Sequence, residues 1–325
     1  MNCESILIVR LGAMGDILHA LPALESLRLS FPRSSIYWLI ASKWSPLLEG
    51  NPSLTALIPF ERHGVRSVIE AWRRLRPLRP ELAFDFQGLI QSALAGRASH
   101  PRSFFGFSRT VVREGLASLF YSHRVTPLSS HVVDRNLELA QAAGATCVPP
   151  APWIPPGRPE GELPTEPFVL CNPFAGWAGK QWPIERYDLL ARLLQSHGLR
   201  LVLSVPDHRK AEISGLQRVH VYHSSLYGLI DATRRAAAVV GLDSGPLHLA
   251  AALQKPGAAL FGPTDPARNG PYGGSMPVIR ADDVATTYRR DNVNHPSMEA
   301  ISAERVLEAV LHSMKHRPVV SERSV

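Results

Sequence analysis

Residues 5–16 read SILIVRLGAMGD, an apolar run that ends in two closely spaced glycines and an aspartate. The apolar, β-branched residues 5–9 are typical of a buried parallel strand. Gly12 and Gly15 then allow the chain to turn sharply, and apolar residues recur at helical spacing from Ile17 onward. This stretch therefore predicts the strand, turn and helix with which an α/β domain begins.

Pro22 lies inside the expected first helix and leaves the start of that helix open. One possibility is a short first turn that starts at Asp16 and kinks at the proline. The other is a main helix that begins near Pro22, because proline is favoured at the first helical position. The residues do not decide between the two.

The alternation of strands and helices continues along the chain, with an interruption in its middle. Further strands are expected at 35–41, 82–86, 168–173, 199–204, 237–241 and 257–262. Further helices are expected at 112–121, 131–144, 183–197, 226–236, 245–254 and 302–315. The interruption, 149–167, holds eight prolines in 19 residues and can donate few backbone hydrogen bonds. It is the best candidate for a domain boundary.

Strand-and-helix runs on both sides of that boundary predict an α/β protein with two Rossmann-like, doubly wound domains that face a central cleft. The expected parts are an N-terminal domain at 1–150, a proline-rich linker at 151–167, a C-terminal domain at 168–300 and a terminal helix and tail at 301–325. Ligands of such sheets bind beyond the carboxyl ends of the strands. The candidate site loops are therefore 10–16, 172–181 and 242–246.

The composition is that of an ordinary globular protein with a basic first half. Hydrophobic residues make up 45% and charged residues 19% of the 325. The formal net charge is +7, and residues 1–150 carry +5 of it, with 16 Lys and Arg against 11 Asp and Glu. That half is the expected surface for an anionic partner or membrane face, although a basic protein without such a ligand would have the same composition.

Three widely spaced cysteines, Cys3, Cys147 and Cys171, lack metal-ligand spacing and favour a reducing compartment. The N-terminus has an early acidic residue and a short apolar run, so no signal peptide is expected. No stretch approaches the roughly 18 apolar residues of a membrane span. We therefore expect a cytoplasmic protein that at most rests on a membrane.

Asp16 and Lys180 are the candidate reactive residues of the first two loops. Asp16 could act as a base, or it could only cap the helix, which is worth about 1 kcal/mol. Its loop has neither the G-x-G-x-x-G dinucleotide fingerprint nor the G-K-[ST] of a P-loop. The second loop reads NPFAGWAGKQWP (172–183), and its small residues and one lysine suit a phosphate, unless Lys180 is a solvated loop lysine.

The third loop, 241–248, reads GLDSGPLH and opens a helix with proline at its first position. A helix start offers unpaired N–H groups and a partial positive charge, which suit a pyrophosphate. His248 lies about one turn into that helix, where it could equally be a packed and satisfied histidine. The next loop, FGPTDP, is expected to add Thr264 and Asp265 to the rim of the same pocket.

The chain resembles the glycosyltransferase family 9 heptosyltransferases from about residue 5 to residue 315. The resemblance is carried by the segments RLGAMGDILHALPAL, FDFQGLIQSAL, NPFAGWAGKQWP, VVGLDSGPLHLAAAL and LFGPTDP. Within the family, REGLASLFY followed by the segment at His131 is most similar to the type I lipopolysaccharide heptosyltransferases. The resemblance implies a GT-B fold, with acceptor binding in the N-terminal domain and nucleotide-sugar binding in the C-terminal domain.

The resemblance also implies roles for individual residues. Asp16 matches the catalytic base of the family, and Lys180 matches the lysine that contacts the donor phosphates. Donor binding is expected to involve, besides Lys180, the residues Asp243, Ser244, Gly245, His248, Thr264 and Glu212. Acceptor binding is expected to involve Arg62, Arg113, His131 and Gly15.

The implied activity is an inverting, metal-independent transfer of heptose from ADP-L-glycero-D-manno-heptose to the Kdo-lipid A inner core, in lipopolysaccharide biosynthesis. ADP-heptose is then a substrate, and no cofactor or metal is expected; the absence of a D-x-D pair agrees. The expected partners are the nucleotide sugar and the anionic lipid acceptor at the cytoplasmic face of the inner membrane. No nucleic acid is expected, and the protein is expected to be a monomer.

Other functions stay open at this point. The nearest is heptosyltransferase II, or another family 9 transferase with a different nucleotide sugar or acceptor. A nicotinamide oxidoreductase and a sugar-nucleotide epimerase share the architecture, and the pI of 9.6 would suit a nucleic-acid-binding protein, although no RNP, zinc or helix-turn-helix signature is present. The arginines at 73–79 either support acceptor binding or form one exposed helix face.

Overall fold

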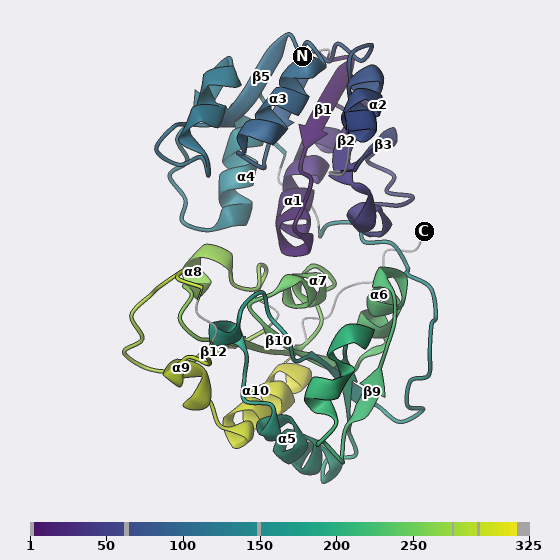
Figure 1. Ribbon diagram of the computed structural model, residues 1–325, viewed down its shortest axis with the longest axis vertical. Helices are drawn as coiled ribbons and strands as arrows, with labels where there is room; N and C mark the ends of the chain where they lie inside the picture. The colour runs from purple at the N-terminus through teal and green to yellow at the C-terminus, as the bar shows by residue number, and fades with distance from the viewer. Residues whose placement is uncertain (1–2, 62–64, 148–150, 275, 291–292, 317–325) are drawn as a thin grey trace. The chain divides into compact units, whose positions relative to one another are not determined.

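The computed structural model describes residues 3–61, 65–147, 151–274, 276–290 and 293–316. The chain forms two compact units, Met1–Pro155 (unit 1) and Pro156–Val325 (unit 2) (Figure 1). Each unit holds one parallel six-stranded sheet and its helices. This arrangement confirms the α/β class with two doubly wound sheets.

The sheet of unit 1 is entirely parallel. Its strands are β1 (Ser5–Val9), β2 (Ser35–Ala41), β3 (Ala56–Phe60), β4 (Leu82–Asp85), β5 (Ser103–Phe107) and β6 (His123–Val125). The helices of unit 1 are α1 (Met14–Ser30), α2 (Val65–Leu75), α3 (Ile90–Ala98) and α4 (Val132–Gln141), with 3-10 helices η1 (Ser42–Leu47) and η2 (Gly115–Phe120). The strand order is β3-β2-β1-β4-β5-β6.

Helices cover both faces of this sheet. The segments α2, α3 and η2 pack on the face that carries Leu7 and Val9 of β1. Ile6 and Ile8, which alternate with them, are also fully buried, so the opposite face is covered too. The right-handed crossover from β1 to β2 and the one from β4 to β5 run along the sheet in opposite directions. The helix α1 therefore lies on the face that carries Ile6 and Ile8. There α1 packs against α4.

Unit 2 repeats the same plan. Its strands are β7 (Phe168–Asn172), β8 (Arg200–Ser204), β9 (His220–Tyr222), β10 (Ala238–Leu242), β11 (Gly257–Phe261) and β12 (Val278–Arg280). Its helices are α5 (Glu185–Gln195), α6 (Leu226–Arg235), α7 (Gly245–Ala252), α8 (Pro266–Asn269), α9 (Pro296–Glu299) and α10 (Ala303–Lys315), with 3-10 helices η3 (Ala178–Lys180) and η4 (Asp207–Ile213). The strand order is β12-β11-β10-β7-β8-β9, again all parallel.

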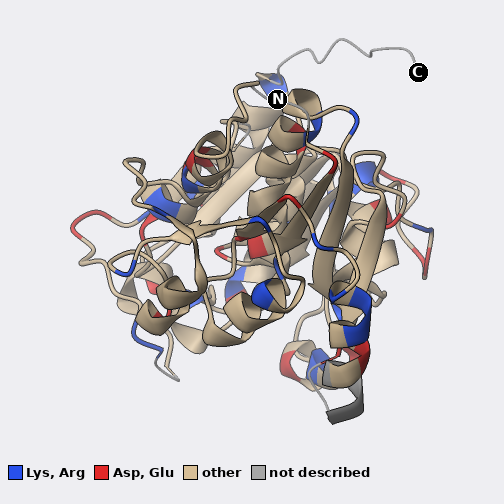
Figure 2. Ribbon diagram, turned by 90° about the horizontal axis from the view of Figure 1, so that it is seen from above, with Lys and Arg blue, Asp and Glu red and all other residues tan. Residues whose placement is uncertain are grey.

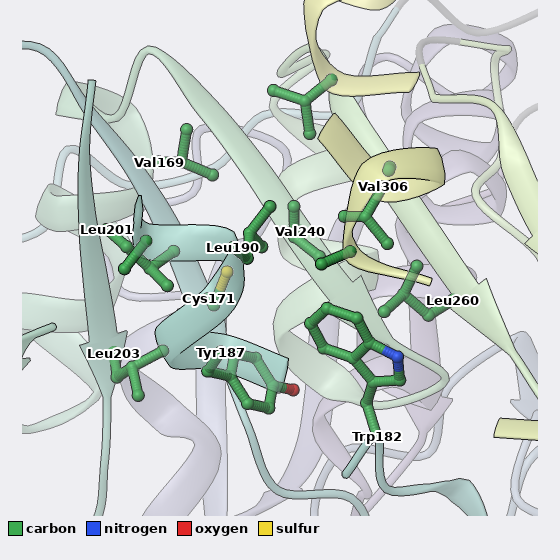
Figure 3. Close-up of a cluster of buried hydrophobic side chains, with 14 of the residues drawn as sticks. Val169, Cys171, Trp182, Tyr187, Leu190, Leu201, Leu203, Val240, Leu260 and Val306 are labelled. Atoms are coloured by element: carbon green, nitrogen blue, oxygen red, sulfur yellow. The ribbon is translucent and has the colours of Figure 1, made fainter. Parts of the chain in front are cut away.

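Alternate side chains of the central strands of unit 2 fill two cores. One core lies under α5 and α10 and includes Cys171, Trp182 and Tyr187 (Figure 3). The Trp182 and Tyr187 rings pack edge to face with centroids 5.0 Å apart, and the Trp182 indole N–H donates to the Ile301 carbonyl at 2.9 Å. Burial raises the pKa of the Cys171 thiol, so this cysteine is a packing residue. The other core contains the inner residues of α6 and α7.

Both sheets have a topological switch point, where the strand order reverses direction. In unit 1 it lies between β1 and β4, and in unit 2 between β7 and β10. Loops that leave neighbouring strands in opposite directions open a crevice there, and this is where open α/β sheets bind ligands. A ligand site is therefore expected at the carboxyl ends of β1 and β4 in unit 1 and of β7 and β10 in unit 2.

Two helix expectations need correction. The first helix begins at Met14, two residues before Asp16, and continues through Pro22 to Ser30, so neither proposed start is right. Packing of α1 in the unit outweighs the hydrogen bond that the proline removes. Of the expected helix 112–121, only the short 3-10 helix η2 forms. The remaining expected strands and helices are confirmed within one to three residues.

The first residues of unit 2, 156–162, run along α6 and are held by specific contacts. The Arg158 N–H donates to the Tyr227 carbonyl at 3.1 Å, and the Arg158 guanidinium lies 4.2 Å from the centroid of the Tyr227 ring. The Glu160 carboxylate accepts hydrogen bonds from both the N–H and the hydroxyl of Ser225, each at 2.7 Å. This part of the proline-rich stretch is thus a strap on unit 2.

Candidate active site

The turn after β1 is fixed by the neighbouring turn after β4. Gln87 Oε1 accepts from the N–H groups of Leu11 and Gly12, at 3.1 and 3.4 Å. The Arg10 guanidinium donates to the Phe86 carbonyl. A Cβ on Gly12 would lie 2.7 Å from the indole nitrogen of Trp44, so any other residue there would force the ring or the turn to shift. The loop that delivers Asp16 is therefore rigidly positioned.

Asp16 is the third residue of α1, and its side chain is 38% exposed. Its Oδ2 accepts from the Ala13 N–H at 3.1 Å and lies 2.6 Å from Nη2 of the buried Arg10. Burial works to raise the pKa of the Asp16 carboxyl, but the Arg10 guanidinium, the Ala13 N–H and the nearby His19 bring it below its ordinary value. Asp16 is thus both a helix-capping group and an ionised, accessible carboxylate.

Two histidines accompany Asp16 in unit 1. His19 lies one turn further along α1 and is 6% exposed, and its ring meets the His131 ring edge to face with centroids 5.8 Å apart. Nδ1 of His131 accepts from the Val133 N–H at 3.2 Å and so caps α4. The structure therefore brings His131 to the helix that carries Asp16. His19 was not expected from the sequence, where it reads as an interior residue of an apolar helix.

Asp85 is the anchor of the turn after β4. Its two carboxylate oxygens accept from the N–H groups of Gln87 and Gly88, at 2.8 and 3.1 Å, and from the hydroxyls of Ser92 and Tyr121, at 2.8 and 2.7 Å. Complete burial raises the pKa of Asp85 in spite of these donors. With four donors and no exposure, Asp85 positions Gln87 rather than reacting.

The other acceptor residues expected in unit 1 are less tightly placed. Gly15 is the second residue of α1, directly before Asp16. Arg113 is exposed, and its backbone N–H lies beside Gly88 at the end of the β4 turn. Arg62 falls outside the described residues. The structure thus places Gly15 and Arg113 at the loops of the unit 1 switch point, and their role in acceptor binding stays a prediction.

In unit 2, Lys180 and Asp243 form a buried ion pair. Lys180 is 9% exposed and Asp243 5% exposed. The Lys180 ammonium pairs with the Asp243 carboxylate, donates to the Asp243 carbonyl at 3.3 Å and lies 4.0 Å from the centroid of the Trp177 ring. Lys180 is therefore not a solvated loop lysine. The pair joins the loop after β7 to the loop after β10, across the switch point.

Further polar groups converge on Asp243. The Thr264 hydroxyl donates to Asp243 Oδ2 at 2.7 Å, and the Asn269 amide donates to Oδ1 at 2.6 Å. Nε2 of His248 lies 4.0 Å from Oδ1. The structure brings together the predicted residues Lys180, Asp243, His248 and Thr264, and adds Asn269 and Trp177, which the sequence patterns did not single out.

Two polar atoms of this cluster are buried without a hydrogen-bond partner among the described residues: the Ser244 hydroxyl and the Trp177 indole nitrogen. Ser244 precedes Gly245, the first residue of α7, but its side chain does not cap the helix. Buried polar groups are normally paired, so such unpaired groups need an explanation. A ligand at the start of α7 would provide one, since the helix also offers its unpaired N–H groups there.

Glu212 does not belong to this cluster as described. It lies exposed on η4, and its carboxylate forms a two-pronged ion pair with Arg209, both distances being 2.6 Å. The Arg209 guanidinium lowers the pKa of Glu212 and also stacks 3.6 Å from the centroid of the Phe174 ring. The predicted role of Glu212 in donor binding stays a prediction.

No cluster of three or more His, Cys, Asp or Glu side chains within the described ranges could hold a metal ion. A search of the same ranges for helices long and apolar enough to cross a membrane finds none.

Residues 68–296 match the profile of glycosyltransferase family 9 (heptosyltransferase), which covers well over half of the chain. The chain belongs to glycosyltransferase family 9. The lipopolysaccharide heptosyltransferase 1 of Pseudomonas aeruginosa is 30% identical to this family 9 member over 300 residues, covering 85% of this chain and 84% of the relative. The family expected from the sequence motifs is confirmed, and with it glycosyltransferase activity.

Solved structures of heptosyltransferases share the fold of this chain. The Escherichia coli heptosyltransferase WaaC with ADP has a TM-score of 0.76 at 25% identity, covering 95% of this chain and 99% of that one. The E. coli ADP-heptose lipopolysaccharide heptosyltransferase II has a TM-score of 0.77 at 23% identity, covering 96% and 99%. Because relatives of more than one type match this chain, the type of heptosyltransferase stays a matter for proposal.

Proposed function

We propose that this family 9 enzyme transfers heptose from ADP-L-glycero-D-manno-heptose to the Kdo-lipid A inner core of lipopolysaccharide, with inversion at the anomeric carbon and without a metal. The observation that carries the proposal is the buried Lys180–Asp243 pair at the start of α7, beside the unpaired Ser244 hydroxyl. Support for the donor comes from the E. coli heptosyltransferase WaaC, which is described with ADP.

The unit 2 cluster has the chemistry that a nucleoside diphosphate needs. Asp243 holds the Lys180 ammonium in place, and Thr264 and Asn269 hold Asp243. A diphosphate at the α7 start would receive the helix N–H groups, the Ser244 hydroxyl and the charge of Lys180. We therefore assign donor binding to unit 2 and expect Gly245 to allow the close approach of the phosphate. His248 and Glu212 complete this assignment.

Asp16 is the proposed base. The acceptor hydroxyl attacks the anomeric carbon of the donor while its proton passes to the Asp16 carboxylate, where Oδ1 takes no part in the Arg10 and Ala13 contacts. The bond from the anomeric carbon to the ADP oxygen breaks, and the leaving diphosphate gains negative charge. Lys180 and the helix N–H groups would stabilise that charge as it develops. A positioned base contributes roughly 10²–10⁴-fold.

Acceptor binding is proposed for unit 1, where Gly15, Arg113 and His131 accompany Asp16. The arginine and the histidine would face the anionic groups of the acceptor. On this proposal the protein acts as a monomer at the cytoplasmic face of the inner membrane, uses no cofactor and binds no nucleic acid. The proposed domain assignments are acceptor binding at 1–150, a connecting stretch at 151–167 whose part 156–162 is held on unit 2, donor binding at 168–300, and a C-terminal helix and tail at 301–325.

A donor and acceptor panel tests the proposal. Purified protein is incubated with ADP-heptose, ADP-glucose, UDP-glucose or GDP-mannose, and with Kdo-lipid A or the same acceptor already carrying one heptose. We expect ADP release and product with ADP-heptose and Kdo-lipid A. Product only with the heptose-bearing acceptor would favour a type II enzyme, and donor turnover without any acceptor would favour an epimerase.

A further inference from the structure

One helical layer of unit 1 has an unusually apolar outer surface. The layer consists of α2, α3 and η2, and neighbouring segments within it contact one another. Its inner residues belong to one core under the sheet, among them Leu75 of α2, Ala93 of α3 and Ala117 of η2. The segments are thus anchored on a common face, and their opposite sides point outward together.

Large apolar side chains gather on that outer side. Among the described residues of unit 1, seven large hydrophobic side chains are exposed, and five of them belong to this layer: Ile69, Trp72, Leu94, Leu116 and Leu119. The two others, Leu29 and Leu128, lie elsewhere in the unit. Leu119 is 64% exposed and Trp72 43% exposed. An apolar surface of this kind on one layer marks an interaction site.

The outer face of α2 combines this apolar surface with arginine. Ile69, Trp72, Arg73 and Arg76 follow one another at spacings of three, one and three residues, which places them on one side of the helix, opposite the buried Ala71 and Leu75. The Arg76 guanidinium lies 4.8 Å from the centroid of the Trp72 ring. A tryptophan flanked by arginines is the composition that favours the interface between water and lipid.

The stretch of chain from α2 to β6, to which the layer belongs, is strongly positive. Residues 69–124 contain nine arginines and four acidic residues, a net charge of +5, which equals the whole excess of residues 1–150. Of the four acidic residues, Asp85 is fully buried and Glu114 accepts the Ile90 N–H at 2.6 Å. The arginines of this layer are among the residues drawn blue in Figure 2. Such a surface would be attracted to a negatively charged partner.

We propose that the outer surface of α2, α3 and η2 docks the enzyme on an anionic phospholipid bilayer. Trp72 and the leucines would enter the headgroup region, and Arg73, Arg74 and Arg76 would lie at the lipid phosphates. Arg113, a proposed acceptor contact, lies two residues before the start of η2, so docking would hold the acceptor loop at the membrane surface. This inference rests on the proposed function only in so far as a lipid acceptor requires access to the bilayer.

Vesicle flotation tests the docking directly, without any activity measurement. The full chain should float with vesicles of phosphatidylglycerol and phosphatidylcholine, should bind much less to pure phosphatidylcholine, and should be released by salt. Quenching of tryptophan fluorescence by brominated lipid should occur and should fall in Trp72→Phe, although that variant still floats. Floating without any loss of quenching in Trp72→Phe would overturn the proposed surface.

Matched pairs of variants locate the surface. Trp72→Ser with Leu119→Ser should reduce partitioning at least about tenfold, whereas Leu29→Ser with Leu128→Ser should leave it unchanged. Arg73→Gln with Arg74→Gln should reduce it about tenfold, whereas Arg33→Gln with Arg192→Gln, which removes the same charge elsewhere, should have a smaller effect. Equal losses in a variant pair and its control would overturn the proposal.

Two further measurements separate this inference from its alternatives. Light scattering after size-exclusion chromatography should give the same mass for the wild type and the Trp72→Ser, Leu119→Ser variant. A dimer that this variant dissociates would identify a second copy of the chain as the occupant and overturn the bilayer proposal.

Transfer to a deacylated, water-soluble acceptor should survive in the variant. An enzyme that transfers heptose but never floats would overturn the docking alone, and one that floats but never transfers would overturn the function alone.

Discussion

The aspartates that follow β1 and β10 occupy comparable places in the two units and are held in opposite ways. Asp16 keeps more than a third of its side chain exposed and pairs through one oxygen with Arg10 and the Ala13 N–H. Asp243 is nearly buried, and Lys180, Thr264 and Asn269 all bond to its carboxylate. The first is therefore accessible, as the proposed base must be, whereas the second is committed to holding a lysine.

The partners of a carboxylate at a switch point, rather than its position, determine what that carboxylate can do. Proximity to a strand end gives both aspartates access to a ligand crevice. On the proposed function, solvent access and an oxygen outside the Arg10 and Ala13 contacts suit Asp16 to accept a proton, and the donors around Asp243 suit it to hold Lys180 in place.

Replacing Asp16 should have the largest effect. Asp16→Asn keeps the size of the side chain but removes the base, so turnover should fall by roughly 10²-fold or more, while ADP-heptose binding persists. Asp134→Asn is a matched control, because Asp134 is likewise the third residue of its helix, α4, and should leave turnover unchanged. Steady-state ADP release and calorimetric donor binding measure the two quantities. Near-normal turnover in Asp16→Asn would reduce Asp16 to a helix cap.

Breaking the Lys180–Asp243 pair should instead affect stability and donor binding together. Removing either partner leaves an unpaired charge in a nearly buried place, and the free energy of unfolding should fall by about 3 kcal/mol. Lys180→Ala should also weaken ADP binding, because the donor phosphates lose their cation. Urea unfolding and ADP titration of Lys180→Ala, Asp243→Asn and the double variant would show whether the losses in the two single variants are coupled. Additive losses would argue against a functional pair.

Arg10→Met should change the pH dependence of the reaction. Burial raises and Arg10 lowers the pKa of Asp16, and the lower value keeps the base ionised down to acidic pH. Without the guanidinium the pKa should rise, so the acid limb of the turnover profile should move to higher pH. The lowered pKa also stabilises the fold above the pKa of the unfolded chain, and this contribution is lost as the pH falls through the folded-state value. An unmoved acid limb would mean that Asp16 is not the titrating base.

Glu212→Gln should have the smallest effect if the exposed Arg209 pair is its whole role. Exposed ion pairs contribute about 0–1 kcal/mol, so stability and turnover should both stay near those of the wild type. A rise in KM for ADP-heptose with unchanged stability would instead support the donor contact implied by the family resemblance. Arg209→Gln is the control that removes the same ion pair from the other side.

The sequence predicts the interior of this fold better than its edges. Central strands such as β1, β7 and β10 are continuous apolar runs, and burial on both faces leaves such runs few alternatives. The edge strands β3, β6, β9 and β12 were not singled out, because a short, partly exposed strand has no comparable pattern. The start of α1 was misjudged because tertiary packing tolerates Pro22, which local propensity treats as a helix breaker.

The candidate site shows the same division. Lys180, Asp243 and Thr264 stand in recognisable loops after strands, and the structure brings them together. Asn269 completes that cluster from a position outside the quoted motifs, and Trp177 lies in the same motif as Lys180 but was not singled out, because their contacts depend on how the loops fold over one another. The resemblance to the family pointed to Asp16 as the base, but only the structure shows that Arg10 tunes its acidity.

The strap at 156–162 determines where a fragment that contains unit 2 alone should begin. Glu160 satisfies the first turn of α6 through Ser225, and Leu163 packs on the core beneath that helix. A polypeptide beginning at Phe168 would lose both contacts and expose the start of α6, whereas one beginning at Pro156 would retain them. Half of the proline-rich stretch is therefore part of the second unit's own architecture, and limited proteolysis of the native protein should release that unit with its strap still attached.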